Sequence, residues 1–319
     1  MTRFSGKTKS VMDFDVIIIG GGAAGLSAVL WCDELGLNAL LLESKTELGG
    51  QLLWTYNEIK NHLGVEAENG RELRDVFVRQ IETRNFTLRL KTEVREVDLK
   101  KKSVTLEKGK TLFARAIIIA TGIKRRKLNV EGEEKFQNKG IIESGKRDQN
   151  LLKDKTAAII GGGDAAFENA LILAETAAKV FLVHRGKDFR ARKEFVGKVL
   201  ENLKVEILTE TVLTKFIGDK RIEAIELKNL KTGDTKILPT EAVLIRIGVA
   251  PDTKIFRGKI DLDGQGYIKI DSRCETNVKD IFAVGDVANP TAPTISSAVG
   301  MGATAAKAIF EMMNDELKS

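Results

Sequence analysis

The chain has 319 residues, of which 43% are hydrophobic and 30% charged, and its formal net charge is +6. These values are ordinary for a soluble globular protein, and the length suggests about two domains with ample buried core. The positive charge is spread along the chain and no nucleic-acid-binding motif occurs, so we expect no nucleic-acid partner. The charge suits anionic cofactors and an acidic partner.

Membrane and targeting signals are the next class to exclude. No apolar run approaches the ~18 residues of a membrane span, and residues 1–11 are polar and basic without a hydrophobic signal core. We therefore expect no membrane association and interpret residues 1–12 as an N-terminal extension. Cys32 and Cys274 lie far apart and form no CxxC, which favours a reducing, cytoplasmic location. We expect no metal site, because no metal-ligand spacing occurs.

The first predicted elements are a buried strand and a helix that are joined by a glycine turn. Val16–Ile19 is an apolar run, Gly20, Gly22 and Gly25 form GxGxxG, and an apolar helix follows. In this motif the glycines allow a sharp turn, close approach of the backbone to a pyrophosphate, and tight packing of helix on strand. Glu43 ends the next strand, at the spacing expected of an acceptor for ribose hydroxyls. This stretch predicts a dinucleotide site.

The chain then continues the same domain. A second glycine turn, Gly49-Gly50-Gln51, precedes a charged helix over 70–84 and an alternating segment over 86–113 that predicts a β-meander. The apolar run 116–119 predicts another buried strand, which ends in a glycine turn at Thr121-Gly122. We expect this turn to end the first segment of the domain.

The opening pattern then repeats. Residues 157–160 predict a strand, Gly161–Ala166 has the pattern GxGxxA, and an apolar helix extends through Ala177, so a second nucleotide-binding domain lies inside the chain. Its next strand ends in His184-Arg185, followed by Arg190, where a ribose-binding acid would stand. Cationic side chains at that place fit a ribose 2′-phosphate and favour NADPH, with NADH and a basic surface turn as the alternatives.

The last predicted elements follow the second domain. A strand over 281–284 runs into Gly285-Asp286, and a helix of small residues extends from Thr294 to about Leu317. The N-terminus of this helix, which includes Ile295 and Ser296, offers free amides and a positive dipole end to an anion.

In this order, the motifs resemble those of the low-molecular-weight thioredoxin reductase family, flavoproteins with two dinucleotide-binding domains. The resemblance implies an α/β fold of two Rossmann-like dinucleotide-binding domains of the FAD/NAD(P)-binding kind, with a three-layer ββα arrangement. The NAD(P)H-binding domain, residues 123–246, would be inserted in the FAD-binding domain, residues 13–122 with 247–319. The resemblance also implies FAD and NADPH as cofactors and a homodimer.

The resemblance further implies which residues bind the cofactors. Asp286 would hold the flavin ribityl chain, and the last helix would present its amides to the flavin pyrimidine edge. The expected FAD contacts are Gly20, Gly22, Ala24, Gly25, Glu43, Gly50, Gln51, Asn61, Thr121, Gly122, Gly285, Asp286, Ile295 and Ser296. The expected NAD(P)H contacts are Gly161, Gly163, Asp164, Ala166, His184, Arg185 and Arg190.

One departure from the family pattern bears on function. Members that reduce thioredoxin carry Cys-x-x-Cys-Asp before the second glycine strand, whereas this chain has Ser144-Gly145-Lys146-Arg147-Asp148 there. A dithiol relay needs two thiols that can close a bridge, so we predict that the chain does not reduce thioredoxin by that route. Asp148 is the one candidate for a catalytic role, in proton transfer. Its other interpretation is a helix cap or a partner of Lys146 or Arg147.

Three interpretations of function stay open. The first is an FAD-dependent oxidoreductase that passes electrons from NAD(P)H through FAD directly to an external acceptor. The acceptor could be ferredoxin or flavodoxin, a quinone, free flavin or oxygen, and ferredoxin would fit the expectation of an acidic partner. The second is a flavin-binding sensor or partner protein with little turnover. The third is an enzyme that is reduced by a protein donor in place of NAD(P)H.

Overall fold

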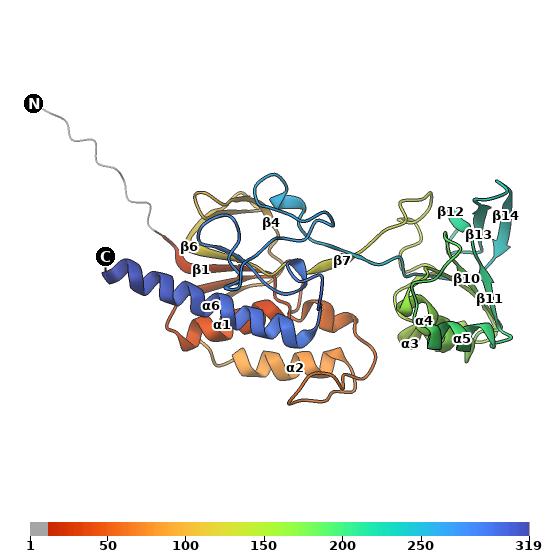
Figure 1. Cartoon of the computed structure of the whole chain (residues 1–319), viewed down its shortest axis with the longest axis horizontal. Helices are drawn as coiled ribbons and strands as arrows, with labels where there is room; N and C mark the ends of the chain where they lie inside the picture. Colours follow the sequence, from red (N-terminus) through yellow and green to blue (C-terminus); the bar gives the residue numbers. More distant parts are fainter. Residues whose placement is uncertain (1–11, 319) are drawn as a thin grey trace, which may run out of the picture. The chain divides into compact units, whose positions relative to one another are not determined.

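The computed structural model describes residues 12–318, so the predicted extension over 1–12 lies outside the described residues except for Met12. The chain forms two units, both drawn in Figure 1. Unit 1 holds the described residues up to Lys124 and from Ala250 onward, and unit 2 is Arg125–Val249. Among the helices of residues 12–318, none is long and apolar enough to cross a membrane.

Unit 1 and the boundary strands β7 and β16 contain the following elements: β1 (Phe14–Ile19), α1 (Ala23–Glu34), β2 (Ala39–Leu42), the 3-10 helix η1 (Gly50–Trp54), α2 (Gly70–Ile81), β3 (Thr87–Arg89), β4 (Val94–Asp98), β5 (Ser103–Leu106), β6 (Thr111–Ile119), β7 (Ile123–Arg125), β16 (Val249–Pro251), η3 (Lys254–Phe256), β17 (Ile281–Ala283), η4 (Gly285–Val287) and α6 (Ile295–Lys318). Unit 2 contains β8 (Ile141–Ile142), α3 (Gly145–Asp148), η2 (Gln149–Leu152), β9 (Thr156–Ile160), α4 (Asp164–Ala174), β10 (Lys179–Val183), α5 (Lys193–Leu200), β11 (Val205–Leu208), β12 (Thr211–Ile217), β13 (Ala224–Asn229), β14 (Thr235–Pro239) and β15 (Ala242–Ile245).

The sheet of unit 1 has the strand order β3-β2-β1-β6-β5-β4, with β17 also paired to β6. The pairs from β3 to β6 and the β6–β17 pair are parallel, whereas β4, β5 and β6 are antiparallel. Because side chains alternate between faces, Val16 and Ile18 pack with α1 and α6, while Ile17 and Ile19 pack with β4, β5 and the segment after β16. Both faces are covered, which explains the continuous apolar run of β1.

Unit 1 therefore has three layers, in which α1, α2 and α6 cover one face of the parallel strands and the β-meander covers the other (Figure 1). Unit 2 has a parallel sheet in the order β11-β10-β9-β15-β8 and a separate antiparallel sheet β12-β13-β14. Helices α4 and α5 pack on one face of the parallel sheet, and the antiparallel sheet packs on the other. The predicted three-layer α/β organisation is therefore present in both units.

Two helices of unit 2 end earlier than predicted. α4 ends at Ala174 because the amides of Glu175 and Thr176 donate to carbonyl groups three residues earlier, as in a 3-10 turn. The Ala178 amide then donates to the Lys155 carbonyl. The sequence over 193–203 predicts a helix through Leu203. α5 ends instead at Leu200, since Asn202 Oδ1 accepts a bond from the Lys204 amide and so forms a turn.

Candidate functional site

The first glycine turn lies between β1 and α1, at the carboxyl end of the parallel strands. Gly20 has a φ of +113°, and a Cβ there would collide with the Ala120 carbonyl, whereas a Cβ at Gly25 would collide with the Gly20 carbonyl. Gly22 differs, because the nearest atom to a Cβ at that position would be the Gly50 Cα at 3.8 Å. Two of the glycines therefore pack the turn, and Gly22 leaves open space of the kind a pyrophosphate needs.

The helices that follow the two glycine turns share a free N-terminus. α1 begins after Gly22 and α4 after Gly163, and neither has a side-chain cap. By contrast, α2 is capped by Asn69 and α3 by Ser144. The first-turn amides of α1 and α4 are thus available to an external anion, which the helix dipole also favours.

Glu43 is buried at the carboxyl end of β2 and holds the first turn. Its Oε2 accepts a hydrogen bond from the Gly21 amide at 2.8 Å, and its Oε1 accepts one from the Lys45 amide at 2.8 Å. A carboxylate oxygen accepts more than one bond, so this geometry leaves capacity for a hydroxyl. The contact of Glu43 with ribose stays a prediction.

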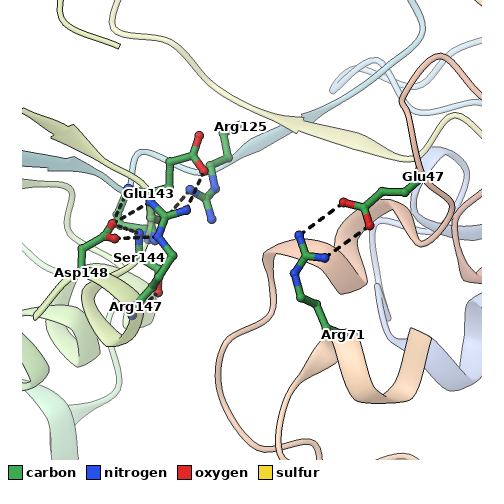
Figure 2. Close-up of polar contacts among 8 residues, drawn as sticks. Glu47, Arg71, Arg125, Glu143, Ser144, Arg147 and Asp148 are labelled. Atoms are coloured by element: carbon green, nitrogen blue, oxygen red, sulfur yellow. Dashed lines mark hydrogen bonds and ion pairs between the residues drawn. The ribbon is translucent and has the colours of Figure 1, made fainter. Parts of the chain in front are cut away.

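The loop that carries Gly50 and Gln51 is fastened across the first turn. The Gly49 amide donates to the Gly21 carbonyl at 2.8 Å, and Gln51 Nε2 donates to the Ile123 carbonyl at 2.9 Å. Glu47 in the same loop accepts two bonds of 3.3 Å from Arg71 of α2, as Figure 2 shows. The predicted residues Gly22 and Gly50 are brought together by these contacts.

The beginning of α6 lies against the beginning of α1 in unit 1. Ser27 Oγ donates to the Val299 carbonyl at 2.6 Å, and a Cβ at Gly302 would collide with the Ala24 carbonyl. A Cβ at Gly285 would lie 2.9 Å from the Ala24 Cβ, so η4 also reaches this corner. Next to Gly285, burial raises the pKa of the Asp286 carboxyl. The predicted residues Ala24, Gly285 and Asp286 therefore lie in one region.

The remaining predicted flavin residues lie at loop ends of unit 1. Ser296 Oγ lies 3.0 Å from His62 Nδ1, beside the exposed Asn61, and Ile295 packs on a small cluster under this loop. Thr121 Oγ1 donates to the Asp252 carbonyl at 2.9 Å, and Gly122 follows with a φ of +67°. α6 differs from α1 at its start, because Thr294 Oγ1 accepts a bond from the Ser297 amide.

The second glycine turn, in unit 2, is filled on one side by a histidine ring. A Cβ at Gly162 would collide with the His184 ring, whose Nε2 lies 3.0 Å from the Asp188 carbonyl oxygen. His184 therefore packs under the turn. Its contact with the nucleotide stays a prediction. Gly163 has no atom within 4 Å of an added Cβ, so the turn is open on that side.

Two predicted residues of α4 support the turn from within the unit. Asp164 accepts bonds from the backbone amide and the Nε of Arg192, at 2.7 and 2.9 Å. Ala166 is fully buried against the sheet. The amide of Arg190 donates to the Gly162 carbonyl at 2.8 Å, which folds the loop after β10 back to the turn. Arg185 and Arg190 have exposed side chains in this loop, as a site for a 2′-phosphate requires.

Asp148 lies in unit 2 and is an ion-pair partner in the structure. It is 4% exposed, and Arg147 donates to both of its oxygens at 2.6 and 2.8 Å (Figure 2). The amides of Glu143 and Ser144 donate to the same carboxylate at 3.2 and 3.4 Å. The sequence allowed pairing with Arg147 as one interpretation of Asp148. Proton transfer by Asp148 stays a prediction.

Both cysteines belong to unit 1, whereas Asp148 belongs to unit 2. Cys32 and Cys274 are free thiols that belong to the same apolar cluster of unit 1. Burial raises the pKa of Cys32 to about 12 and that of Cys274 to about 11. Within residues 12–318, no three His, Cys, Asp or Glu side chains are grouped as a metal site would require.

Arg125 and Arg246 are not among the site residues predicted from the sequence. Both donate to the carbonyl oxygen of Glu143, at 2.8 and 2.6 Å. Glu143 and Arg246 are far apart along the chain and are brought together by the pairing of β8 with β15. The sequence does contain one indication of a site at Arg246. This residue directly follows an apolar strand, and ligands of parallel sheets bind at the carboxyl ends of such strands.

Comparisons with known proteins cover nearly the whole chain. Residues 14–302 match the family described as pyridine nucleotide-disulphide oxidoreductase. The chain is 34% identical over 296 residues to a thioredoxin reductase of Streptomyces coelicolor, with 92% of this chain and 91% of that protein covered. It is 30% identical over 299 residues to a 34.2 kDa protein in the rubredoxin operon of Clostridium pasteurianum, with 93% and 96% covered.

Solved structures give the same result. The thioredoxin reductase of Lactococcus lactis has a TM-score of 0.82 and 31% identity, with 95% of this chain and 100% of that chain covered. The thioredoxin reductase of T. acidophilum has a TM-score of 0.78 and 28% identity, with 94% and 99% covered. These matches confirm the predicted fold of two Rossmann-like nucleotide-binding domains.

Proposed function

Because the chain belongs to the pyridine nucleotide-disulphide oxidoreductase family, we propose that it is an FAD-dependent oxidoreductase without a redox dithiol. Electrons would pass from NADPH through FAD directly to an external acceptor. FAD and NADPH, the cofactors predicted from the motifs, agree with this family. The proposal departs from the relatives in the last step, since several of them are named thioredoxin reductase.

The observation that carries the proposal is the state of the two thiols. A dithiol relay requires a thiolate that can attack a disulfide and a second thiol that can resolve the mixed disulfide. Cys32 is fully buried and Cys274 is 4% exposed, and burial raises both pKa values to about 12 and about 11. Both thiols therefore stay protonated and covered at neutral pH, so they are unsuited to a relay.

The residues of unit 1 fit FAD by the open space at Gly22 and by the uncapped N-terminus of α1. The α1 amides would bind the pyrophosphate, and Glu43 would accept a ribose hydroxyl while it holds the Gly21 amide. Asp286 would accept a hydroxyl of the ribityl chain, which would offset the cost of its burial. When bound, the flavin would supply the electron-transfer chemistry.

The residues of unit 2 fit a nicotinamide dinucleotide by the same two features, at Gly163 and α4. The exposed guanidinium groups of Arg185 and Arg190 would bind the 2′-phosphate that distinguishes NADPH from NADH. Arg192 is already engaged by Asp164, so it would position the loop rather than bind phosphate.

The acceptor class is supported by charge and by one relative. The net charge of +6 favours encounter with an acidic partner, and a relative lies in a rubredoxin operon. We therefore propose a small acidic electron-transfer protein as the first acceptor to test. A homodimer is proposed from the family resemblance.

The test is anaerobic mixing of the purified flavoprotein with NADPH and, separately, with NADH. The proposal predicts rapid loss of flavin absorbance with NADPH, slower loss with NADH, and reoxidation by an acceptor panel of ferredoxin, rubredoxin, quinone, free flavin and oxygen. A flavin that stays oxidised with both nucleotides would contradict the proposal. It would favour a binding protein or reduction by a protein donor.

A further inference from the structure

A group of arginines lies beyond the carboxyl ends of β8 and β15 in unit 2. Glu143 directly follows β8, and Arg246 directly follows β15. Arg125 Nη1 and Arg246 Nη2 donate to the same Glu143 carbonyl oxygen, at 2.8 and 2.6 Å. Figure 2 shows Arg125 and Arg147 on either side of Glu143. The guanidinium groups of Arg125 and Arg246 are therefore held close together by one neutral acceptor, the Glu143 carbonyl oxygen.

Arg147 engages two carboxylates of this group. Arg147 binds Asp148 through two hydrogen bonds and lies 3.5 Å from a Glu143 carboxylate oxygen. Arg246 instead donates to two backbone carbonyl oxygens, those of Ile245 at 3.0 Å and Glu143. Its charge is thus held by peptide dipoles in a partly buried place, which is less favourable than an ion pair.

The surroundings of Arg246 favour an added negative charge. Burial and the neighbouring charge of Arg125 lower the pKa of Arg246 to about 10, although the carboxylates of Glu143, Asp148 and Glu168 oppose the shift. An anion on the guanidinium would remove part of this cost.

This place is also where the topology of unit 2 puts a ligand. The Arg246 amide donates to the Ile160 carbonyl at 2.7 Å, and a Cβ at Gly161 would collide with the Arg246 carbonyl. Arg246 therefore adjoins the second glycine turn on the β15 side, whereas Arg185 follows β10 on the other side of β9. Ligands of open α/β sheets bind in a crevice outside the carboxyl ends of the strands. This crevice forms where the connections that follow two neighbouring strands run to opposite sides.

We propose that Arg246 and Arg125 form an oxyanion-binding subsite, for a phosphate or a carboxylate, on the β15 side of the second glycine turn. The planar guanidinium group matches both anions. Two sources share this chemistry: the nicotinamide-side phosphate of a dinucleotide bound at the turn, or a separate anionic ligand. The first source rests on the proposed function, whereas the subsite itself does not.

Calorimetric binding of inorganic phosphate to the full-length flavoprotein tests the subsite. Arg246→Gln keeps a donor for the Glu143 carbonyl but removes the charge, and Arg125→Gln gives a second variant at an exposed position. A charge-assisted hydrogen bond contributes about 1.5–3 kcal/mol, so Arg246→Gln should weaken phosphate binding by about tenfold or more. Arg221→Gln removes an exposed arginine of the same unit, outside this group, and should leave binding unchanged.

Two nucleotides distinguish the sources. If Arg246→Gln weakens NADP⁺ but not adenosine 2′,5′-bisphosphate, which lacks the nicotinamide-side phosphate, the dinucleotide is the source. If it weakens inorganic phosphate and neither nucleotide, a separate anion is the source. Wild-type protein that binds no phosphate, or folded Arg246→Gln and Arg125→Gln variants that bind it as wild type does, would overturn the proposal. Phosphate binding needs no turnover, so this failure is distinct from failure of the proposed function.

Discussion

Arg147 holds the carboxylate of Asp148 through two hydrogen bonds, from Nε to Oδ1 at 2.6 Å and from Nη2 to Oδ2 at 2.8 Å. The pair lies in the segment where the family resemblance places a dithiol and its aspartate. An arginine here neutralises the buried acid that remains. Residues 144–148 therefore contain an ion pair between Arg147 and Asp148 and a helix cap at Ser144, and they contain no sulfur atom.

Removal of Arg147 should expose the cost of burying Asp148. Arg147→Ala leaves the carboxylate with two backbone amides, and we expect a loss of about 1–2 kcal/mol in the free energy of unfolding, reduced by the partial exposure of Arg147. Urea unfolding measures this loss. The double variant with Asp148→Asn should lose less than the sum of the single losses. Strict additivity would show that the pair is not coupled.

Glu43→Gln should weaken both the first turn and flavin binding. A glutamine has one acceptor oxygen, so its amide would face the N–H of Gly21 or Lys45, at a cost of about 1–3 kcal/mol in the apoprotein. Apoprotein unfolding and flavin titration measure the two effects. Glu47→Gln, in the neighbouring loop, loses the charge of its pair with Arg71 at 3.3 Å and of the longer pair with Arg74 at 4.0 Å, and should stay within about 1 kcal/mol of wild type. Equal losses in the two variants would contradict the role of Glu43.

Asp286→Asn should stabilise the apoprotein in a pH-dependent way. Burial raises the folded-state pKa of Asp286 above its ordinary value of 3.8, so its ionised form is disfavoured by folding. The stability that the protonated acid contributes is complete below the unfolded pKa and is lost as pH rises through the folded pKa. Asparagine stays neutral, so the variant should melt higher than wild-type apoprotein at pH 7, with a smaller difference near pH 4.

Flavin affinity provides the second readout for Asp286. We expect the same Asp286→Asn variant to bind FAD more weakly, because the amide is a poorer acceptor for a hydroxyl than a carboxylate. A stability gain that does not change with pH would contradict the burial argument. Unchanged flavin affinity would contradict the assigned contact.

Arg185→Gln and Arg190→Gln should reduce the preference for NADPH. Each guanidinium group would make charge-assisted hydrogen bonds to the 2′-phosphate, so each variant should bind NADP⁺ about tenfold or more weakly. NAD⁺ lacks this phosphate and serves as the control, with unchanged affinity. Equal loss for both nucleotides would show that the two arginines support the fold of the loop instead.

The two α/β units could be predicted from local patterns. An apolar run that is followed by a glycine turn and a second apolar run predicts a strand, a turn and a helix within a short stretch. This prediction needs no information from distant parts of the chain. The packing of His184 under Gly162 could not be predicted in the same way. It depends on the absence of one Cβ opposite one ring, and the sequence is compatible with either a contact or a packing role.

Contacts between distant strand ends were also beyond local patterns. Glu143 and Arg246 meet because β8 and β15 pair in register, Val243 with Ile141 and Leu244 with Ile142. Arg125, on β7, also reaches the Glu143 carbonyl. A charged residue after a strand becomes informative only when its neighbour in the sheet is known. The roles of the individual cofactor contacts stay predictions.

An anaerobic reductive titration of the purified protein tests the central claim most directly. A protein whose flavin is its only redox centre takes up two electrons per FAD, whereas an oxidised protein whose flavin is coupled to a redox-active disulfide takes up four. We predict two electrons per FAD, with the same value for the Cys32→Ala, Cys274→Ala variant, because both thiols are buried and protonated. Uptake of four electrons, with two of them lost in that variant, would contradict the account.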